Sequence, residues 1–275
     1  MTTSQLQKSR AFRALHERAG AFIIPNPWDA GTAKILAALG FEALATTSLG
    51  LAAALGRRDG AGAVSRDEVI DNCAAIATAT DLPVSADLEN CYAHEPRAAA
   101  EMIRLAAEAG VVGGSIEDAT GNADKPIYDF ELAVERVHAA VETARSLAFP
   151  FVLTARAENF MHGRRDLDDT IRRLQAFESA GADVLYAPGL RDLATIRTVA
   201  SSVGKPLNVV AGFLEPGISA GELAQAGVKR ISVGGGLCRL ALARMIEGAR
   251  EMKERGSFGW LQDMVPTAEL MKMFR

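Results

Sequence analysis

The stretch Pro83-Val-Ser-Ala-Asp87-Leu-Glu89-Asn-Cys-Tyr92 is a short apolar run that ends abruptly in two carboxylates, Asp87 and Glu89. Residues two apart on a strand point to the same face, so these carboxylates converge if Glu89 is still extended. A second run, Val111-Val-Gly-Gly-Ser-Ile-Glu117-Asp118, ends in the same way. Two neighbouring strands that finish in carboxylates form a cluster of negative charge, and a hard divalent ion such as Mg²⁺ fits it.

Runs of this kind recur along the chain, with amphipathic helical patterns between them. The predicted strands are Ala21–Ile24, Ala43–Thr47, Pro83–Asp87, Val112–Glu117, Phe151–Arg156, Val184–Ala187, Leu207–Val210 and Arg230–Val233. Eight strands that alternate with helices predict an α/β protein, a (β/α)8 TIM barrel, with a doubly wound open sheet as the alternative. The barrel is favoured because eight units fill the chain and no Gly-x-Gly-x-x-Gly turn follows the first strand.

The composition limits the classes of function. The chain has 275 residues, 49% of them hydrophobic, and a formal net charge of −4. It is long enough for one large α/β barrel, and its mild acidity gives no electrostatic reason to expect nucleic acid. No apolar stretch approaches the roughly 20 residues that span a bilayer. Three cysteines without metal-ligand spacing favour a reduced, cytoplasmic setting.

The last residues form an apolar-rich tail. The pattern predicts a single barrel domain over residues 1–275, with 256–275 as a C-terminal helical tail. Its apolar side chains must be buried on the chain's own barrel or on a partner subunit.

The active site of such a barrel is built at the C-terminal ends of the strands. Those ends carry a polar set that is acidic on one side and holds one arginine. The set is Asn26, Trp28, Asp29, Thr47, Ser48, Asp87, Glu89, Glu117, Asp118, Arg156, Glu158, Asn159, Tyr186, Asn208 and Gly234–Gly236. It suits a small anionic substrate held between a metal ion and a guanidinium.

Several of these residues have a structural alternative. A carboxylate at a strand end often caps the next helix, and for Asp29 and Asp118 that alternative is as good as a functional one. Arg156 could pair with Glu158 or Glu117 instead of contacting substrate. The Gly234–Gly236 run could bind phosphate, but a tight turn is the favoured interpretation.

Three further side chains could carry protons or act as a nucleophile. Cys91 could be a nucleophile, although a free cysteine more often packs inertly. His162 could be an acid or base on a loop. The sequence does not say whether His162 or Tyr128 enters the site.

The order and spacing of several motifs resemble the isocitrate lyase/phosphoenolpyruvate mutase superfamily. The motifs are Pro25-Asn-Pro-Trp-Asp-Ala30, Thr46-Thr-Ser-Leu49, Ala54-Leu-Gly-Arg-Arg-Asp59, Asp87-Leu-Glu89, Gly113-Gly-Ser-Ile-Glu-Asp118, Thr154-Ala-Arg156 and Pro206-Leu-Asn-Val209. The resemblance implies a barrel whose last helix swaps between subunits, as a homodimer or homotetramer.

The resemblance also implies a set of roles. Asp87 would be the principal metal-associated carboxylate, and Glu89 and Glu117 would complete the acidic shell, partly through waters. The implied metal ligands are Asp87, Glu89 and Glu117; the catalytic residues Arg156, Glu117 and Asp59; and the substrate contacts Thr47, Ser48, Leu49, Asp87, Arg156 and Asn208. The implied cofactor is Mg²⁺, with Mn²⁺ as the alternative ion.

Two departures from the family pattern bear on the reaction. Isocitrate and methylisocitrate lyases carry a Cys-containing loop after the fourth strand, whereas residues 119–128 here contain neither Cys nor His. These two activities are therefore not expected. The metal motif reads Asp-x-Glu-x-Cys-Tyr, with Cys91 where the family has Gly. Asn122 and Lys125 only loosely match the gating loop of the phosphonate enzymes.

The sequence thus predicts an enzyme, a Mg²⁺-dependent carbon–carbon lyase. Its substrate would be a small 2-oxo or 2-hydroxy (di)carboxylic acid, and the reaction would pass through an enolate by C–C cleavage or decarboxylation. One alternative is a phosphonopyruvate-type enzyme that breaks a C–P bond. The other is a non-catalytic protein that binds a 2-oxo acid.

Overall fold

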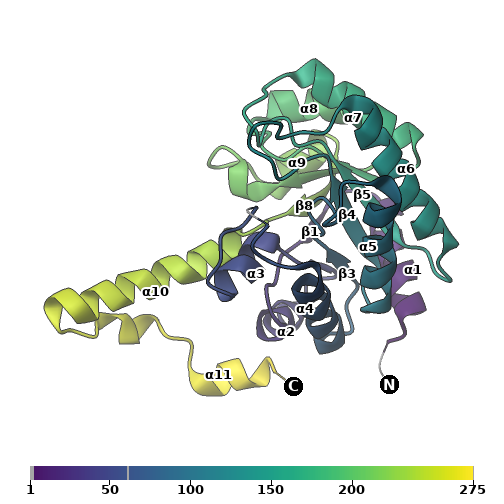
Figure 1. Ribbon diagram of the computed structural model, residues 1–275. Helices are drawn as coiled ribbons and strands as arrows, with labels where there is room; N and C mark the ends of the chain where they lie inside the picture. The colour runs from purple at the N-terminus through teal and green to yellow at the C-terminus, as the bar shows by residue number, and fades with distance from the viewer. Residues whose placement is uncertain (1–2, 61, 275) are drawn as a thin grey trace.

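Eight parallel strands form a nearly closed barrel in the computed structural model, which describes residues 3–60 and 62–274 (Figure 1). The strands are β1 (Phe22–Ile24), β2 (Leu44–Ala45), β3 (Val84–Ala86), β4 (Gly113–Glu117), β5 (Val152–Arg156), β6 (Val184–Tyr186), β7 (Leu207–Val210) and β8 (Val228–Ser232). Seven neighbouring pairs, in the order β1-β8-β7-β6-β5-β4-β3-β2, form parallel ladders. The predicted (β/α)8 barrel is confirmed.

Helices connect the strands, and those between β1 and β8 cover the outside of the barrel (Figure 1). They are α1 (Gln5–Glu17), α2 (Ala30–Ala38), α3 (Ser48–Ala54), α4 (Arg66–Ala79), α5 (Pro96–Glu108), α6 (Phe130–Ser146), α7 (Leu167–Ser179), α8 (Leu193–Ser201), α9 (Ala220–Gln225), α10 (Gly236–Arg255) and α11 (Thr267–Lys272), with 3-10 turns η1 (Ala211–Phe213) and η2 (Gly259–Asp263). The main core lies between these helices and the outward face of the strands.

The N-terminal end of the barrel is closed by α1. Its Phe12 is fully buried in a second cluster with residues from the starts of several strands, among them Phe22 and Val152. A Cβ at Gly113 would lie 2.8 Å from the Phe12 ring, so glycine permits this close approach. With this end plugged, any ligand must enter at the opposite end, where the strands finish.

The barrel is least complete between β1 and β2, which share no ladder. One backbone bond joins their ends, from Ala45 N–H to the Pro25 carbonyl at 3.0 Å. Asn26 adds a side-chain bond, Nδ2 to the Thr46 carbonyl at 2.9 Å, and its Oδ1 accepts from Val233 and Gly234. Asn26 thus ties β2 and the end of β8 together.

The predicted strands agree with those observed to within two residues, and β7 has the predicted bounds. The main difference concerns β3, which ends at Ala86. Glu89 has φ of +47°, and Cys91 and Tyr92 are also left-handed. The condition for Asp87 and Glu89 to share one face, that Glu89 is still extended, is therefore not met, because the chain turns out of the sheet before it.

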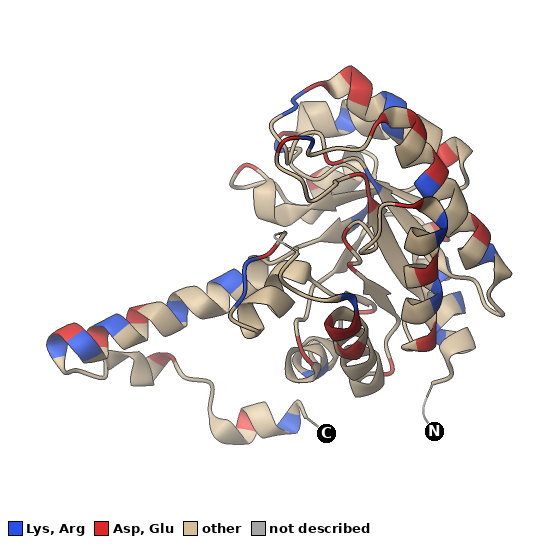
Figure 2. Cartoon of the chain, viewed as in Figure 1, with Lys and Arg blue, Asp and Glu red and all other residues tan. Residues whose placement is uncertain are grey.

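The C-terminal segment extends away from the barrel. Figure 1 shows α10 projecting outwards, followed by η2 and α11, and Figure 2 shows both signs of charge along it. Trp260 packs on Gly248, and Lys34 donates to the Phe274 carbonyl. Large apolar side chains on this arm remain exposed, among them Leu240, Met245, Met252, Phe258, Leu261 and Met264.

None of the helices in residues 3–60 and 62–274 combines the length and apolar character that crossing a bilayer requires.

Candidate active site

A pocket of about 190 Å³ lies at the mouth of the barrel, where the strands end. Its lining includes Asp87, Arg156 and Tyr186, each at or just beyond the end of a different strand, and Asn208 inside β7. This is the place expected for the active site of a (β/α)8 barrel.

Asp87 is held on two sides. Its backbone N–H donates to Oγ1 of Thr46 at 2.8 Å, which fixes the residue directly after β3. Its Oδ2 accepts from the backbone N–H of Ser48 at 3.1 Å, at the start of α3. The carboxylate is thereby positioned before any ligand binds.

Arg156 contacts three carboxylates. Its guanidinium lies 2.8 Å from Asp87, 3.0 Å from Glu117 and 2.8 Å from Glu158. Both pairings that the sequence left open, with Glu158 and with Glu117, are present together with a third. A guanidinium has five N–H donors, so donors remain for a substrate oxygen.

The mouth holds more negative than positive charge. Burial raises the pKa of Glu117 well above its ordinary value despite the opposing charge of Arg156, and neighbouring carboxylates raise it further. Burial alone would lower the pKa of Arg156, but Glu158, Glu117 and Asp87 outweigh it and raise that pKa. The site therefore contains an arginine that stays charged, and beside it a buried carboxylate whose pKa is raised.

Asp59 adds to this excess. It lies on the loop between α3 and α4, is exposed overall, and lines the rim of the mouth pocket. Desolvation on the pocket side and the charge of Asp87 raise its pKa. A cation bound near Asp87 would relieve both effects.

Glu89 lies in the left-handed turn that follows β3. Its carboxylate accepts from the Tyr92 hydroxyl at 2.6 Å, and burial, followed by the charge of Asp87, raises its pKa against that hydrogen bond. The buried guanidinium of Arg136 binds the carbonyls of Asn90, Ala93 and His94 and so holds the left-handed segment in place.

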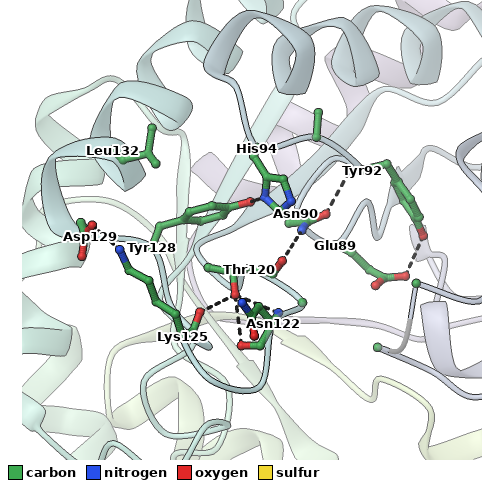
Figure 3. Close-up of a pocket in the computed structure, with 14 residues that line it drawn as sticks. Glu89, Asn90, Tyr92, His94, Thr120, Asn122, Lys125, Tyr128, Asp129 and Leu132 are labelled. Carbon is green, nitrogen blue, oxygen red and sulfur yellow. Dashed lines mark hydrogen bonds and ion pairs between the residues drawn. The ribbon is translucent and has the colours of Figure 1, made fainter.

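Glu89 lines a second pocket of about 620 Å³ and not the mouth pocket (Figure 3). Here Nδ1 of His94 lies 2.6 Å from the Tyr128 hydroxyl, and Lys125 pairs with Asp129 at 2.5 Å. Tyr128, whose role was left open, thus lies beside the mouth pocket and not in it.

The acidic residues suit a hard divalent ion by their chemistry and their excess charge. Within residues 3–60 and 62–274, no three His, Cys, Asp or Glu side chains are close enough to form a metal cluster. Asp87 faces the mouth pocket, Glu89 faces the second pocket, and Glu117 lies against Arg156. This arrangement fits Asp87 as a direct ligand, but within the described residues Glu89 and Glu117 do not come together with it in one metal cluster.

The other residues expected to bind substrate also lie at the mouth. Thr47 caps α3 by accepting from Gly50 N–H at 3.4 Å, and Leu49 lines the pocket. Asn208 on β7 is buried and donates to Ser232 at 3.1 Å. The structure thus brings Thr47, Ser48, Leu49, Asp87, Arg156 and Asn208 to one pocket.

Other candidates lie outside it. Asp29 is the N-cap of α2, as its structural alternative predicted, whereas Asp118 accepts from Glu158 N–H and Arg173. His162 is exposed on a turn. Cys91 is buried, and burial raises the pKa of its thiol to about 12, which describes a packed side chain.

Several polar residues of the mouth pocket were missed, and Arg230 is the charged one among them. Arg230 on β8 lines the pocket and is buried. For the eighth strand only Gly234–Gly236 were considered, whereas Arg230 lies inside the strand, two positions before Ser232 on the same face. That alternation was the signal that could have found it.

Comparison with known proteins agrees with this geometry. A family model described as phosphoenolpyruvate phosphomutase matches residues 12–253. The chain belongs to the isocitrate lyase/phosphoenolpyruvate mutase superfamily. The resemblance drawn from the motifs is confirmed.

Within this superfamily, one similar structure is a Burkholderia cenocepacia J2315 protein described only by class, as a lyase or mutase. It is 57% identical, with a TM-score of 0.95, and the match covers 98% of this chain and 96% of that chain. The structure of 2,3-dimethylmalate lyase is 27% identical, with a TM-score of 0.84, over 99% and 95% of the two chains. Oxaloacetate decarboxylase of Ectopseudomonas mendocina is 28% identical over 206 residues, 73% of this chain and 69% of that protein.

Proposed function

We propose that this protein is a Mg²⁺-dependent carbon–carbon lyase that acts on a small 2-oxo or 2-hydroxy dicarboxylic acid. The observation that carries the proposal is the mouth pocket of about 190 Å³, in which Asp87 and Arg156 are fixed side by side. The pocket has room for a small organic acid. Relatives named as 2,3-dimethylmalate lyase and oxaloacetate decarboxylase support this choice of chemistry.

The residues that would hold the ion are Asp87 directly and Glu89 and Glu117 through waters. Mg²⁺, or Mn²⁺ in its place, would supply a Lewis acid that stabilises the negative charge of an enolate. The hydrogen bond that Asp87 N–H donates to Thr46 Oγ1 and the one that it accepts from Ser48 N–H keep Asp87 in position for this task.

Arg156 stabilises the negative charge that develops on the 2-oxo oxygen when the C–C bond breaks. Its three carboxylate partners hold the guanidinium in a fixed orientation and keep it protonated. A preorganised cation of this kind costs no reorganisation during the reaction. Its remaining N–H donors are the ones available to the substrate.

The loop after β4 favours a reaction that needs little acid–base help. Residues 119–128 contain neither Cys nor His, and the isolated bridge between Ala119 and Ile127 gives the loop a compact form. Decarboxylation of an oxaloacetate-like acid meets this condition, because CO₂ leaves without a general base.

The C–P alternative is less well supported by the charges. A phosphonate substrate would profit from an additional cation near the mouth, but Lys125 pairs with Asp129 on the exposed part of its loop. Release of phosphate from phosphonopyruvate would nevertheless identify that enzyme.

The test is a screen of 2-oxo and 2-hydroxy acids with Mg²⁺, followed by NMR for new products. Asp87→Asn should abolish the metal-dependent turnover, whereas Asp124→Asn on an exposed loop should leave it unchanged. Full activity of Asp87→Asn with a 2-oxo acid would contradict the mechanism. Tight Mg²⁺-dependent binding without any product would instead identify a non-catalytic binding protein.

A further inference from the structure

The interior of the barrel directly below the mouth is polar. The inward positions there are usually filled by branched apolar side chains. In this chain β3, β4, β5, β7 and β8 contribute Ser85, Ser115, Thr154, Asn208 and Arg230, all of them buried. The floor of the mouth pocket is therefore made of hydrogen-bonding groups.

Arg230 is the charged member of this layer and is only 6% exposed. Its Nε donates to Oδ1 of Asn208 at 2.8 Å and its Nη2 to Oγ1 of Thr154 at 2.9 Å. Its Nη1 is buried and has no hydrogen-bond partner. Both partners are neutral, so they orient the guanidinium without compensating its charge.

Arg230 also lacks a counter-charge. Among the described residues no carboxylate forms an ion pair with it, in contrast to Arg156, which has three. Burial lowers the pKa of Arg230 to about 10, so the group remains a cation at neutral pH. A buried charge without a partner is unfavourable unless a ligand supplies one.

The two arginines line the same pocket but differ in their surroundings. The mouth is acidic around Arg156, whereas the floor around Arg230 has a positive charge and no negative one. Three carboxylates compensate the charge of Arg156, so among the described residues that line the pocket the uncompensated positive charge is that of Arg230.

We propose that Arg230 binds the carboxylate next to the 2-oxo or 2-hydroxy carbon of the substrate, which places the reacting carbon between the floor and Arg156. The inference rests on the proposed function and extends it to the orientation of the substrate. The bond that breaks then faces the mouth and the second pocket, so the leaving fragment departs outwards. Holding the leaving carboxylate on the floor would instead oppose decarboxylation.

The test measures by calorimetry the binding of Mg²⁺ and then the binding of oxalate. Oxalate is a small dicarboxylate that resembles a pyruvate enolate. Arg230→Gln should bind Mg²⁺ as the wild type does but lose oxalate affinity at least tenfold. Arg230→Lys, which keeps the charge, should lose less. Thr154→Val, which removes a partner of the guanidinium but not its charge, serves as the matched control and should lose little.

Equal oxalate affinity in Arg230→Gln and wild type would overturn the inference, and so would an equal loss in Thr154→Val. If Arg230→Gln does not fold, NMR of wild-type protein with ¹⁵N-labelled arginine replaces it. Oxalate should then shift a buried guanidinium signal that is absent in Arg230→Lys, and no shift would overturn the inference. Failure of the wild type to bind oxalate or to turn over any acid would instead contradict the proposed function.

Discussion

The guanidinium of Arg156 donates to Oδ1 of Asp87 across 2.8 Å, although the two residues are 69 positions apart in the chain. This contact joins the end of β5 to the residue after β3 and passes over the floor of the pocket. The contact also places Arg156, which should stabilise the transition state, next to Asp87, which should hold the metal.

Arg156→Ala should lower kcat/KM. The corresponding activation free energy should rise by roughly 3–4 kcal/mol, the scale of a lost oxyanion contact. The loss should fall mainly on kcat, because the preorganised charge acts on the transition state. Steady-state kinetics with the acid found by the screen would measure it, with Arg13→Ala on the exposed face of α1 as the control. A change in KM alone would speak against this role.

Cys91 should tolerate glycine better than alanine. Its φ of +60° is left-handed, which disfavours alanine by about 1–2 kcal/mol, a penalty that glycine avoids. Cys73 is an equally buried cysteine inside α4. There the alanine variant should be more stable than the glycine variant by about 1 kcal/mol. Urea unfolding of the four variants would measure both differences. The same order at both positions would refute the strained turn.

Gly235→Ala should disturb the site, because a Cβ there would lie 2.7 Å from Cδ2 of Leu49 in the pocket wall. Overpacking of this kind costs about 1–3 kcal/mol, and the displaced Leu49 should raise KM. Gly236→Ala is the matched control, since its nearest neighbouring atom is 3.9 Å away. Thermal melts and kinetics should separate the two variants, and identical behaviour would count against the packing of Leu49 on this glycine.

His16 should make the fold sensitive to mild acid. Burial lowers its folded pKa to about 3, and its Nδ1 bonds to the Phe12 carbonyl. Between pH 6.5 and 3 the unfolded chain binds a proton that the folded chain does not. The free energy of unfolding therefore decreases as the pH is lowered, by up to about 1.4 kcal/mol per pH unit. The contribution is fully present above pH 6.5.

Unfolding curves between pH 7 and 4.5 would test the effect of His16. His16→Gln should flatten the pH dependence, and His138→Gln at an exposed position should leave it unchanged. Parallel curves for wild type and His16→Gln would show that the acid sensitivity has another source.

The exposed arm should bind a second subunit, as a homodimer or homotetramer. Leu240 on α10 is 61% exposed and Leu39 on the barrel is 60% exposed. The same substitution to glutamate at both positions therefore differs only in whether it lies on the arm or on the barrel. Leu240→Glu should reduce the mass measured by light scattering after size exclusion, and Leu39→Glu should not. A monomeric wild type would contradict the expectation.

The fold was predictable because its signals are local. Each apolar run is short, and helices that end in glycine separate the runs, so the bounds of β7 were correct and the others nearly so. The convergence of Asp87, Glu117 and Arg156 followed from the parallel topology, which brings all strand ends to one edge.

The rest depends on contacts between distant parts of the chain. The turn at Glu89 is stabilised by Arg136, which lies 46 positions beyond Asn90, one of the residues whose carbonyls it binds. The burial of Arg230 follows from Thr154 and Asn208 on other strands. Alternation along β8 places Arg230 on the same face as Ser232, but no local pattern reports the contacts that it makes with the other strands.

The gap in the ladder between β1 and β2 gives the wall a seam that borders the chemistry. Thr46, whose carbonyl is bound by Asn26 across that seam, also holds the backbone of Asp87 through its hydroxyl. A movement of the wall at this seam would therefore reach the carboxylate that we propose as the metal ligand. A substitution that strengthens the contact between Asn26 and Thr46 should then also alter the affinity for the ion.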